Sequence, residues 1–232
     1  AKILRLVNSP MYGFPGRISS ISHAMMLLGF NVVKGLVLTA AIFDSFAAGA
    51  RGLWEHSLGT AILSRRIARE LGLKDAEEIM IAGLLHDLGK VILSHLYGED
   101  YQQAREIATA RRIPIARAEL EIFGVDHEQV GQWIATAWHL PPRLVDTLTY
   151  HHHPSRAKHA ANYATIVQLA DILARGMGYG DGGDPIIAEI DQEAYNALHL
   201  STEHIERVLA GADQEFASGA HLLEELADTP VS

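Results

Sequence analysis

The sequence predicts an all-α protein, and three observations carry this prediction. Apolar residues recur at the 3.6-residue spacing of an amphipathic helix along nearly the whole chain, and no convincing stretch alternates with the period of two that marks a strand. The composition is globular, with 48% apolar and 20% charged residues. At 232 residues, the chain is long enough for one large domain or two small ones with a substantial core.

Capping and turn residues set the expected helix boundaries. Asn31 is expected to cap one helix, and Asp75 heads another with capping-box spacing to Glu78. Gly124 is a suitable residue to end a helix, and Asp126 to cap the next one. The predicted helices cover residues 1–9, 20–28, 32–46, 53–71, 76–87, 99–112, 115–123, 127–138, 141–153, 161–175, 191–198 and 202–226.

A Gly/Ala stretch at 47–52 divides these helices into two groups. We expect residues 1–50 to form a small N-terminal helical lobe and residues 51–232 a larger helical bundle. The chain begins inside a helical pattern and without Met, so we expect the lobe to be truncated at its start. The longest apolar run, Val32 to Phe43, is shorter than the roughly 20 residues of a membrane span, and no signal pattern is visible. We therefore expect a cytoplasmic protein that binds no membrane.

Charge and residue counts narrow the function classes. The formal net charge of −9 repels phosphate backbones, so we expect no direct binding to nucleic acid. The absence of cysteine excludes disulfides, thiolate zinc sites, iron–sulfur clusters and cysteine nucleophiles. The chain has 13 histidines, and nine of them lie between His56 and His159. With no cysteine present, this excess indicates that any metal site is formed by imidazole and carboxylate groups.

Two carboxylates in apolar surroundings are the first candidates. His86 and Asp87 are adjacent at the end of an apolar helix, where an unpaired carboxylate carries a heavy desolvation cost. A metal ion, or a cation held nearby, would remove that cost. Asp171 lies in the middle of another apolar helix, and a hydrogen bond to an arginine or to a helix terminus explains it as well as a metal does.

Histidines at comparable depth in other helices extend the set. His56 lies about one turn into an amphipathic helix, where a satisfied core or surface histidine is the commoner explanation. His127 begins its own helix, and the histidine triplet at 151–153 ends another, where the helix dipole also favours cationic imidazoles. The candidate metal ligands are His56, His86, Asp87, His127, His151, His152 and Asp171.

Such a mixed set of imidazoles and carboxylates indicates the class of metal. It suits Fe, Mn, Zn or Ni better than Ca, which prefers oxygen ligands. The candidates outnumber the four ligands of one tetrahedral zinc ion. We therefore expect one or two divalent ions.

The order H…HD…D of these candidates resembles the HD superfamily of metal-dependent phosphohydrolases, and the extended order HDxGK…H…HH…D is similar to the dinuclear pattern of its HD-GYP branch. The N-terminal stretch AKILRLVNSPMYGFPGRISSISHAMMLLGF, followed by VKGLVL, resembles the HDOD domain more closely still. This resemblance covers essentially the whole chain. The chain departs from the HD-GYP branch because it has no GYP motif and has His153-Pro154 where that branch places an acid. These departures argue against hydrolysis of cyclic-di-GMP.

The resemblance implies an HD-type helical bundle with a small N-terminal lobe, and a regulatory or output role in bacterial signalling. The implied partner is a signalling protein or a fused regulatory domain. Many HDOD proteins have lost metal ligands and serve as interaction modules, whereas this sequence fills every position of the extended pattern. We therefore expect a regulatory HDOD domain with a retained His/Asp metal site.

An active phosphohydrolase or phosphodiesterase is the alternative that the resemblance leaves open. It would act on a phosphate ester or a nucleotide with a metal-activated water, and its candidate catalytic residues are Asp87 and Lys90. Asp87 would bridge two ions, and Lys90 would hold the phosphoryl oxygens. A solvated lysine at a helix end explains Lys90 equally well. The glycine-rich segment 176–185 lacks the order of a phosphate-binding loop and is expected to be a flexible connector.

Overall fold

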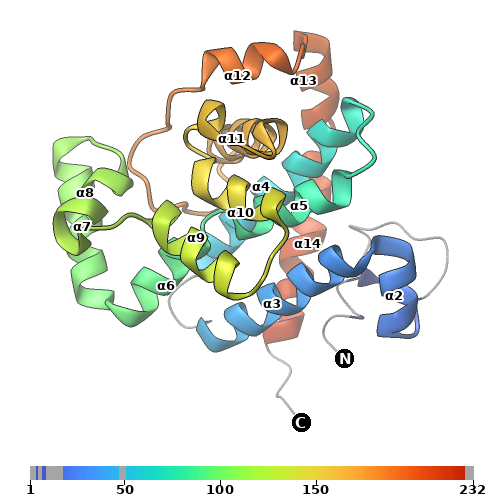
Figure 1. Cartoon of the computed structure of the whole chain (residues 1–232), viewed down its shortest axis with the longest axis horizontal. Helices are drawn as coiled ribbons and strands as arrows, with labels where there is room; N and C mark the ends of the chain where they lie inside the picture. The colour runs from blue at the N-terminus through green and yellow to red at the C-terminus, as the bar shows by residue number, and fades with distance from the viewer. Residues whose placement is uncertain (1–3, 5–6, 9–17, 47–50, 228–232) are drawn as a thin grey trace.

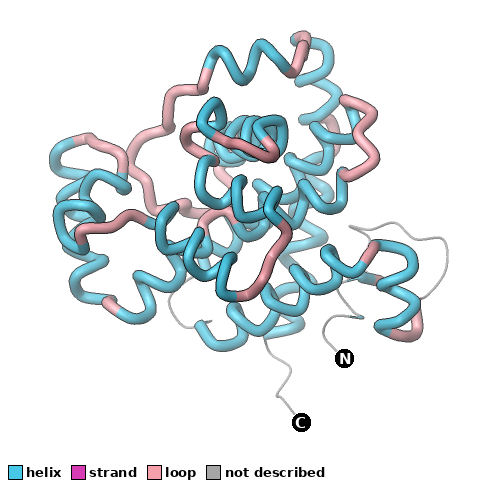
Figure 2. The backbone as a smooth tube through the Cα atoms, viewed as in Figure 1, coloured by secondary structure: helices cyan, strands magenta, loops and turns pink. Residues whose placement is uncertain are grey.

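The computed structural model describes residues 4, 7–8, 18–46 and 51–227. All regular structure in this part of the chain is helical (Figure 2), which confirms the predicted all-α class. The helices are α2 (Ile21–Leu28), α3 (Phe30–Phe46), α4 (Arg51–Glu70), α5 (Ala76–Leu85), α6 (Leu88–Leu96), α7 (Gly98–Arg111), α8 (Ile115–Phe123), α9 (His127–Ala137), α10 (Pro142–Tyr150), η1 (Pro154–Arg156, a 3₁₀ turn), α11 (Ala161–Gly176), α12 (Gln192–Ala197), α13 (Thr202–Leu209) and α14 (Ala212–Ala227).

Helices α4, α5 and α11 form the centre of the bundle (Figure 1). Beyond its acidic first turn, α5 is apolar on every side and wholly buried, as expected for a helix surrounded by others. α4 packs against α5, α11, α13 and α14, and α10 packs against α9, α11 and α5. Two apolar clusters fill the spaces between these helices, one around Ile62, Met80 and Leu144 and the other around Ile67, Ile79 and Ile166.

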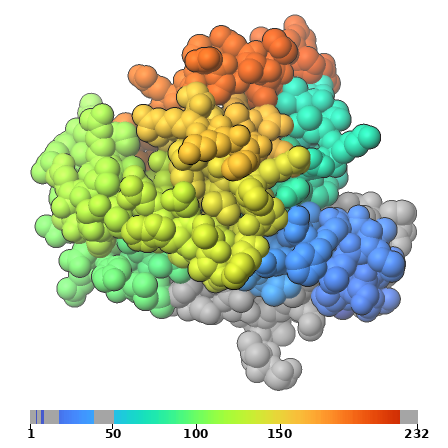
Figure 3. Space-filling model, viewed as in Figure 1, coloured from blue at the N-terminus to red at the C-terminus, as the bar shows by residue number. Residues whose placement is uncertain are grey.

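The remaining helices surround this centre. In Figure 1, α6, α7 and α8 lie together on one side, and α2 and α3 lie on another, with α3 packed against α5. Figure 3 shows α9 to α11 forming the face between these two groups. The lobe boundary that the sequence predicts near 47–52 includes residues 47–50, which lie outside the described residues, so the division into lobes stays a prediction. The predicted helix at 1–9 also lies mostly outside them.

Several helix boundaries differ from the prediction, each for a local reason. α3 begins at Phe30, so Asn31 lies inside the helix and does not cap it. Asp75 makes no capping bond, because its carboxylate accepts hydrogen bonds from Arg143 and Tyr163 instead. The sequence prediction missed α6 altogether. The last predicted helix is two helices, α13 and α14, which meet at residues 210–211.

The helix ends around α9 agree with the prediction. α8 ends before Gly124, which has a left-handed backbone with φ of 71°. Asp126 caps α9, and its carboxylate accepts a hydrogen bond from the Gln129 N–H at 2.9 Å. This cap fixes His127 as the first residue of α9, at the inner end of the helix.

Among the residues that the structure describes, one stretch is long and apolar enough to cross a membrane by length and composition alone. It is Ala76–Leu96, which includes α5 and α6 and has a hydropathy of 1.4. Within the fold, 78% of an 18-residue apolar part of this stretch is buried. Packing in the core therefore accounts for its apolar character.

Candidate metal centre

The buried helix α5 carries the pair His86 and Asp87 into the middle of the bundle. α5 ends at Leu85, the pair forms the turn that follows, and α6 begins at Leu88. The His86 and Asp87 side chains are at most 1% exposed. Because the second half of α5 is apolar on every face, packing draws its end into the core and takes the polar pair with it.

Four other elements bring the remaining candidates to the same place. His56 lies on α4, His127 begins α9, and Asp171 lies on α11. The histidines at 151 and 152 follow the last turn of α10. All seven candidate ligands therefore meet at one centre, although they come from well-separated parts of the chain.

Gly89 allows the closest of these approaches. A Cβ at this position would collide with the backbone of His127. The first turn of α6 therefore packs directly against the start of α9, which brings Asp87 within reach of His127.

The candidates form two groups on either side of Asp87. We call His56, His86 and Asp171 the deep cluster, and His127, His151 and His152 the outer cluster. Within each cluster, one nitrogen or oxygen of each residue lies within 4.8 Å of the others. The deep cluster is wholly buried, whereas His152 in the outer cluster is partly exposed.

In the deep cluster, two imidazoles face two carboxylates. His56 Nε2 lies 2.8 Å from Asp171 Oδ1, and His86 Nε2 lies 3.3 Å from Asp87 Oδ2. Neither nitrogen has the alignment of a hydrogen bond with a described residue. Two buried nitrogens thus face carboxylate oxygens across a space where a cation would satisfy all of them.

In the outer cluster, three imidazoles surround the other oxygen of Asp87. Asp87 Oδ1 lies 3.8 Å from His127 Nε2 and 3.7 Å from His151 Nε2. His127 Nε2 and His152 Nε2 are 3.2 Å apart. Asp87 therefore directs Oδ2 to the deep cluster and Oδ1 to the outer one, as the bridging role suggested from the sequence requires.

Hydrogen bonds behind the rings orient several of these histidines. His86 Nδ1 lies 2.7 Å from the Gly83 carbonyl oxygen, and His151 Nδ1 lies 3.1 Å from that of Leu148. Each carbonyl oxygen can accept a hydrogen bond from a protonated Nδ1, and in that neutral tautomer the lone pair of Nε2 is free. In metal sites this arrangement fixes the tautomer that binds the ion.

A buried glutamate does the same for His127. Glu119 Oε2, on α8, lies 2.6 Å from His127 Nδ1 and accepts a hydrogen bond from the His127 backbone N–H at 2.8 Å. Sequence reasoning missed Glu119. The signal for it was weak: an acid on one side of an amphipathic helix looks solvated until the fold shows which side is buried.

Two cations neutralise the carboxylates of the centre. Lys90, itself fully buried, donates to Asp87 Oδ2 at 3.0 Å. Arg175 donates to Asp171 Oδ1 at 2.7 Å, four residues along α11. The interpretation of Lys90 as a solvated helix-end lysine is therefore wrong. The arginine partner considered for Asp171 is present, and it stands beside the histidines rather than in place of them.

Burial and neighbouring charges decide the protonation states. Burial alone would raise the pKa values of both aspartates. The neighbouring His86 ring and the Lys90 charge nevertheless hold the pKa of Asp87 well below its ordinary value, and the Arg175 charge does the same for Asp171. Both carboxylates are therefore ionised and available to a cation.

The pKa values of the histidines differ because their surroundings differ. Burial lowers the pKa of His56 and His151, and it lowers that of His152 to about 3. Burial would also lower the pKa of His127, but the Glu119 charge outweighs it and raises that pKa to about 9. Three of these rings are thus neutral near pH 7, as metal ligands must be.

The centre passes a test of fit for a metal ion. The ring nitrogens of His56 and the Nε2 atoms of His86 and His151 are buried and have no hydrogen-bond partner in the described part of the chain; the same holds for Asp87 Oδ1. Buried polar atoms without partners are rare in folded proteins and call for an explanation. Here they converge between two clusters of metal-binding side chains. The residues fit one or two divalent ions.

The glycine-rich segment after α11 closes the centre on one side. Tyr179, Gly182 and Gly183 are buried, and Lys90 donates to the Gly182 carbonyl at 3.0 Å. This packing contradicts the prediction of a flexible connector at 176–185. The sequence shows the glycines but not what they pack against.

The chain matches the model of a known protein family. A family model described as the HDOD domain matches residues 1–154. This range includes the whole N-terminal part and six of the seven candidate ligands. Asp171 lies beyond it.

This chain is similar to parts of two longer curated proteins. An uncharacterized protein of Treponema pallidum is 26% identical over 187 residues, which are 79% of this chain and 36% of that protein. Ribonuclease Y of Thermus thermophilus is 31% identical over 120 residues, which are 52% of this chain and 16% of that enzyme. The chain thus spans about a third or less of the length of either relative.

Solved structures share the fold over nearly the whole chain. An HDOD domain protein of unknown function from Geobacter sulfurreducens has a TM-score of 0.74 and 27% identity, covering 97% of this chain and 80% of that one. The MmoQ response regulator of Methylococcus capsulatus has a TM-score of 0.54 and 23% identity, covering 90% and 82%. The second likeness shows the fold alone.

Proposed function

The chain belongs to the HDOD domain family, and on that premise we propose that it is a regulatory domain of a bacterial signalling protein with a metal ion bound in its His/Asp centre. The observation that carries the proposal is the position of Asp87. Its two carboxylate oxygens face two separate clusters of buried ligands, and several ligand atoms there have no other partner.

The ligand chemistry supports one or two transition-metal ions. The deep cluster with Asp87 Oδ2 would hold one ion, and the outer cluster with Asp87 Oδ1 would hold the other. Imidazoles with a few carboxylates favour Fe, Mn, Zn or Ni over Ca. A divalent ion bound there would supply Lewis-acid chemistry toward a phosphoryl oxygen.

The closed state of the centre supports a regulatory role. The deep cluster is inaccessible to solvent, and the two cations beside it are already paired with carboxylates of the chain. A phosphate ester has no open position beside Lys90 in this conformation. An ion in such a centre would stabilise the domain or report on a ligand that opens it.

A phosphohydrolase is the second candidate, and the shared carboxylate is the observation that favours it. Two ions bridged by Asp87 would suit in-line attack on a phosphate ester, with Lys90 placed to hold a phosphoryl oxygen. The chain itself would orient the ester through Lys90 and exclude water through the surrounding helices. A phosphate ester or a nucleotide is the ligand class that both candidates share.

The partner follows from the regulatory role. We expect a signalling protein, or a regulatory domain fused to this one, in the cytoplasm. The net charge of −9 supports a protein partner over direct contact with nucleic acid or an anionic membrane surface.

Metal analysis of protein purified without a histidine tag tests the proposal. We expect one or two equivalents of a transition metal per chain, and at least one equivalent fewer in His86→Ala. His95→Ala, an exposed histidine at the far end of α6, is the matched control and should keep the metal. A folded wild-type protein that stays free of metal after incubation with Mn²⁺, Fe²⁺ and Zn²⁺ would overturn the proposal.

An activity assay separates the two candidates. The metal-loaded protein is incubated with phosphodiesters, nucleotides and a nitrophenyl phosphate ester. The regulatory proposal expects no turnover. Turnover that needs the metal and disappears in Lys90→Ala would establish the hydrolase instead.

A further inference from the structure

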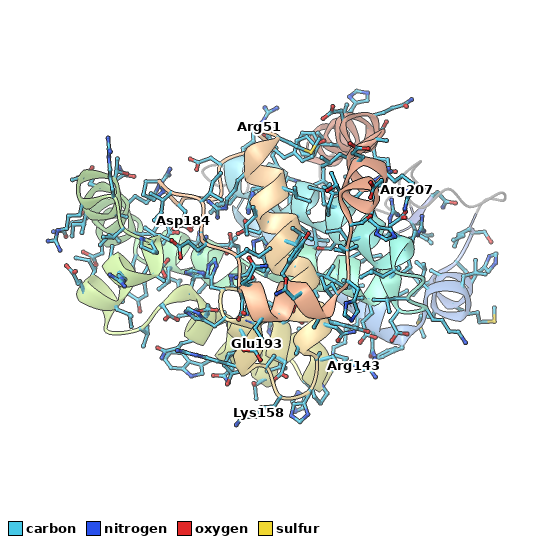
Figure 4. The ribbon with its side chains drawn as sticks, turned by 90° about the horizontal axis from the view of Figure 1, so that it is seen from above. Arg51, Arg143, Lys158, Asp184, Glu193 and Arg207 are labelled. Atoms are coloured by element: carbon cyan, nitrogen blue, oxygen red, sulfur yellow. The ribbon has the colours of Figure 1, made fainter. Side chains whose placement is uncertain are left out.

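The segment that follows α11 packs against one side of the metal centre, where Gly182 and Asp184 accept hydrogen bonds from Lys90. We call residues 178–184 the glycine loop. It leaves the end of α11, crosses the start of α4 and reaches the side of the bundle formed by α7 and α8. Figure 4 shows Asp184 at the end of this loop, between α11 and those helices.

Asp184 binds the donors that line this side of the centre. Its Oδ2 accepts from Lys90 Nζ at 3.0 Å and lies 3.4 Å from a terminal nitrogen of Arg175. Its Oδ1 accepts from the backbone N–H of Ile115, the first residue of α8, at 2.7 Å. Two cations and the positive end of a helix therefore surround one carboxylate.

This donor set is the one that binds phosphate. A lysine supplies a point charge, an arginine supplies a planar pair of donors, and a helix N-terminus supplies free N–H groups and a favourable dipole. A carboxylate and a phosphoryl group are both anions with outward oxygens. Asp184 thus occupies the place that a phosphoryl group would take beside the metal centre.

Release of Asp184 would leave neither cation unpaired. Lys90 would keep Asp87 at 3.0 Å, and Arg175 would keep Asp171 at 2.7 Å. An incoming phosphate would restore the lost contacts. The penalty that normally holds a buried ion pair together, an uncompensated charge in the interior, is therefore small here.

The rest of the loop is built to pack closely on the site. A Cβ at Gly182 would lie 3.0 Å from the ring of His56 and closer still to the end of the Arg175 side chain, so the loop packs tightly against both side chains. The other end is held by Tyr179, which stacks on Phe216 at 4.1 Å and donates to Asp213 of α14. The loop is anchored at α14 and closes over the centre at Asp184.

We infer that the glycine loop is a latch, and that Asp184 blocks an oxyanion pocket formed by Lys90, Arg175 and the Ile115 N–H until a phosphate group displaces it. The inference rests on the proposed function, since it names the regulation and the ligand class of the same centre. The anchor at Tyr179 would pass the displacement of the loop to α14.

Phosphate titration tests the latch. Inorganic phosphate is titrated calorimetrically into the wild-type chain, Asp184→Asn and the control Glu189→Gln, which removes the same charge from an exposed position five residues further on. We expect Asp184→Asn to bind phosphate at least tenfold more tightly than the other two. Adding Lys90→Met to Asp184→Asn should abolish this gain.

Equal affinities in the wild type and Asp184→Asn would overturn the latch. If Asp184→Asn does not fold, hydrogen exchange of the wild-type loop amides decides: faster exchange in saturating phosphate supports displacement, and unchanged exchange rejects it. Metal content is measured on the same samples. A metal-free chain with a tenfold gain in phosphate affinity would refute the proposed metal site and keep the latch, and a metal-loaded chain without the gain would do the reverse.

Discussion

The deep and outer clusters share Asp87, yet they are built differently. The deep cluster combines imidazoles with Asp171, and Arg175 neutralises that carboxylate from the same helix. The outer cluster contains only imidazoles, and its charge partner is Glu119, which lies behind His127 and away from Asp87. One cluster is thus ready for a cation at any pH near neutrality, whereas the other must first release a proton from His127. Changes at the shared carboxylate should have the largest effect, and changes in protonation the smallest.

Asp87→Asn breaks both clusters at once. We expect loss of all bound metal, because each cluster loses its bridging oxygen charge. The metal-free variant should also lose about 3 kcal/mol of unfolding free energy, since a buried lysine loses one of its two carboxylates. Metal analysis and urea unfolding measure the two effects. Asp100→Asn, an exposed acid in the first turn of α7, should change neither. Full metal occupancy in Asp87→Asn would show that Asp87 does not bridge the two clusters.

His56→Ala and His151→Ala separate the two clusters. Each variant should lose about one metal equivalent, because each removes a ligand from a different cluster and leaves the other intact. Metal content of the two variants and of the double variant checks this. If either single variant loses both equivalents, the seven residues form one site rather than two.

Glu119→Gln tests the orientation of His127. The glutamine still accepts a hydrogen bond but carries no charge, so the His127 ring becomes a weaker ligand. Loss of such a partner typically lowers metal affinity about 10- to 100-fold, and we expect an effect in this range at the outer cluster alone above the His127 pKa of about 9, where no proton competes for the ring. Metal titration measures it, and Glu121→Gln, exposed on the same helix, is the matched control. An equal loss of affinity at the deep cluster would show that Glu119 supports the fold and not the ligand.

The pH dependence of metal binding should differ between the clusters. The pKa of His127, raised to about 9, means that its ring carries an extra proton below that pH, so an ion at the outer cluster must displace this proton. Affinity there should rise about tenfold per pH unit between pH 7 and 9. The pKa of His56 is lowered and those of Asp87 and Asp171 are well below their ordinary values, so the deep cluster should change little over this range. Metal titrations at pH 7, 8 and 9 test the contrast, and identical slopes would contradict it.

The sequence was most informative where one residue type could serve few purposes. Asp171 in an apolar helix and the pair His86 and Asp87 at the end of another needed partners, and the fold brings them together. The cap at Asp126 could also be predicted, because a helix cap depends only on a few neighbouring residues. The order of the candidate ligands resembles that of HD proteins, and this resemblance indicated that residues far apart in the sequence form one site.

Features that depend on distant contacts were not visible. Asp184 lies 94 residues from Lys90, and nothing near it in sequence indicates a buried partner. α6 was missed because the sequence prediction placed Asp87 at the end of the preceding helix, whereas in the structure this residue is the capping position of α6. The break between α13 and α14 has a local cause: Gly211 has a φ of 80°, which a helix does not contain. The prediction missed it because the apolar periodicity continues across this glycine.

Anomalous X-ray diffraction from crystals of tag-free, metal-loaded protein tests the central claim most directly, because it locates each ion. The account predicts a peak on one or both sides of Asp87, among His56, His86 and Asp171 on the first side and among the outer histidines on the second. A well-ordered centre that shows no anomalous peak in crystals grown with Mn²⁺ or Zn²⁺ would contradict it.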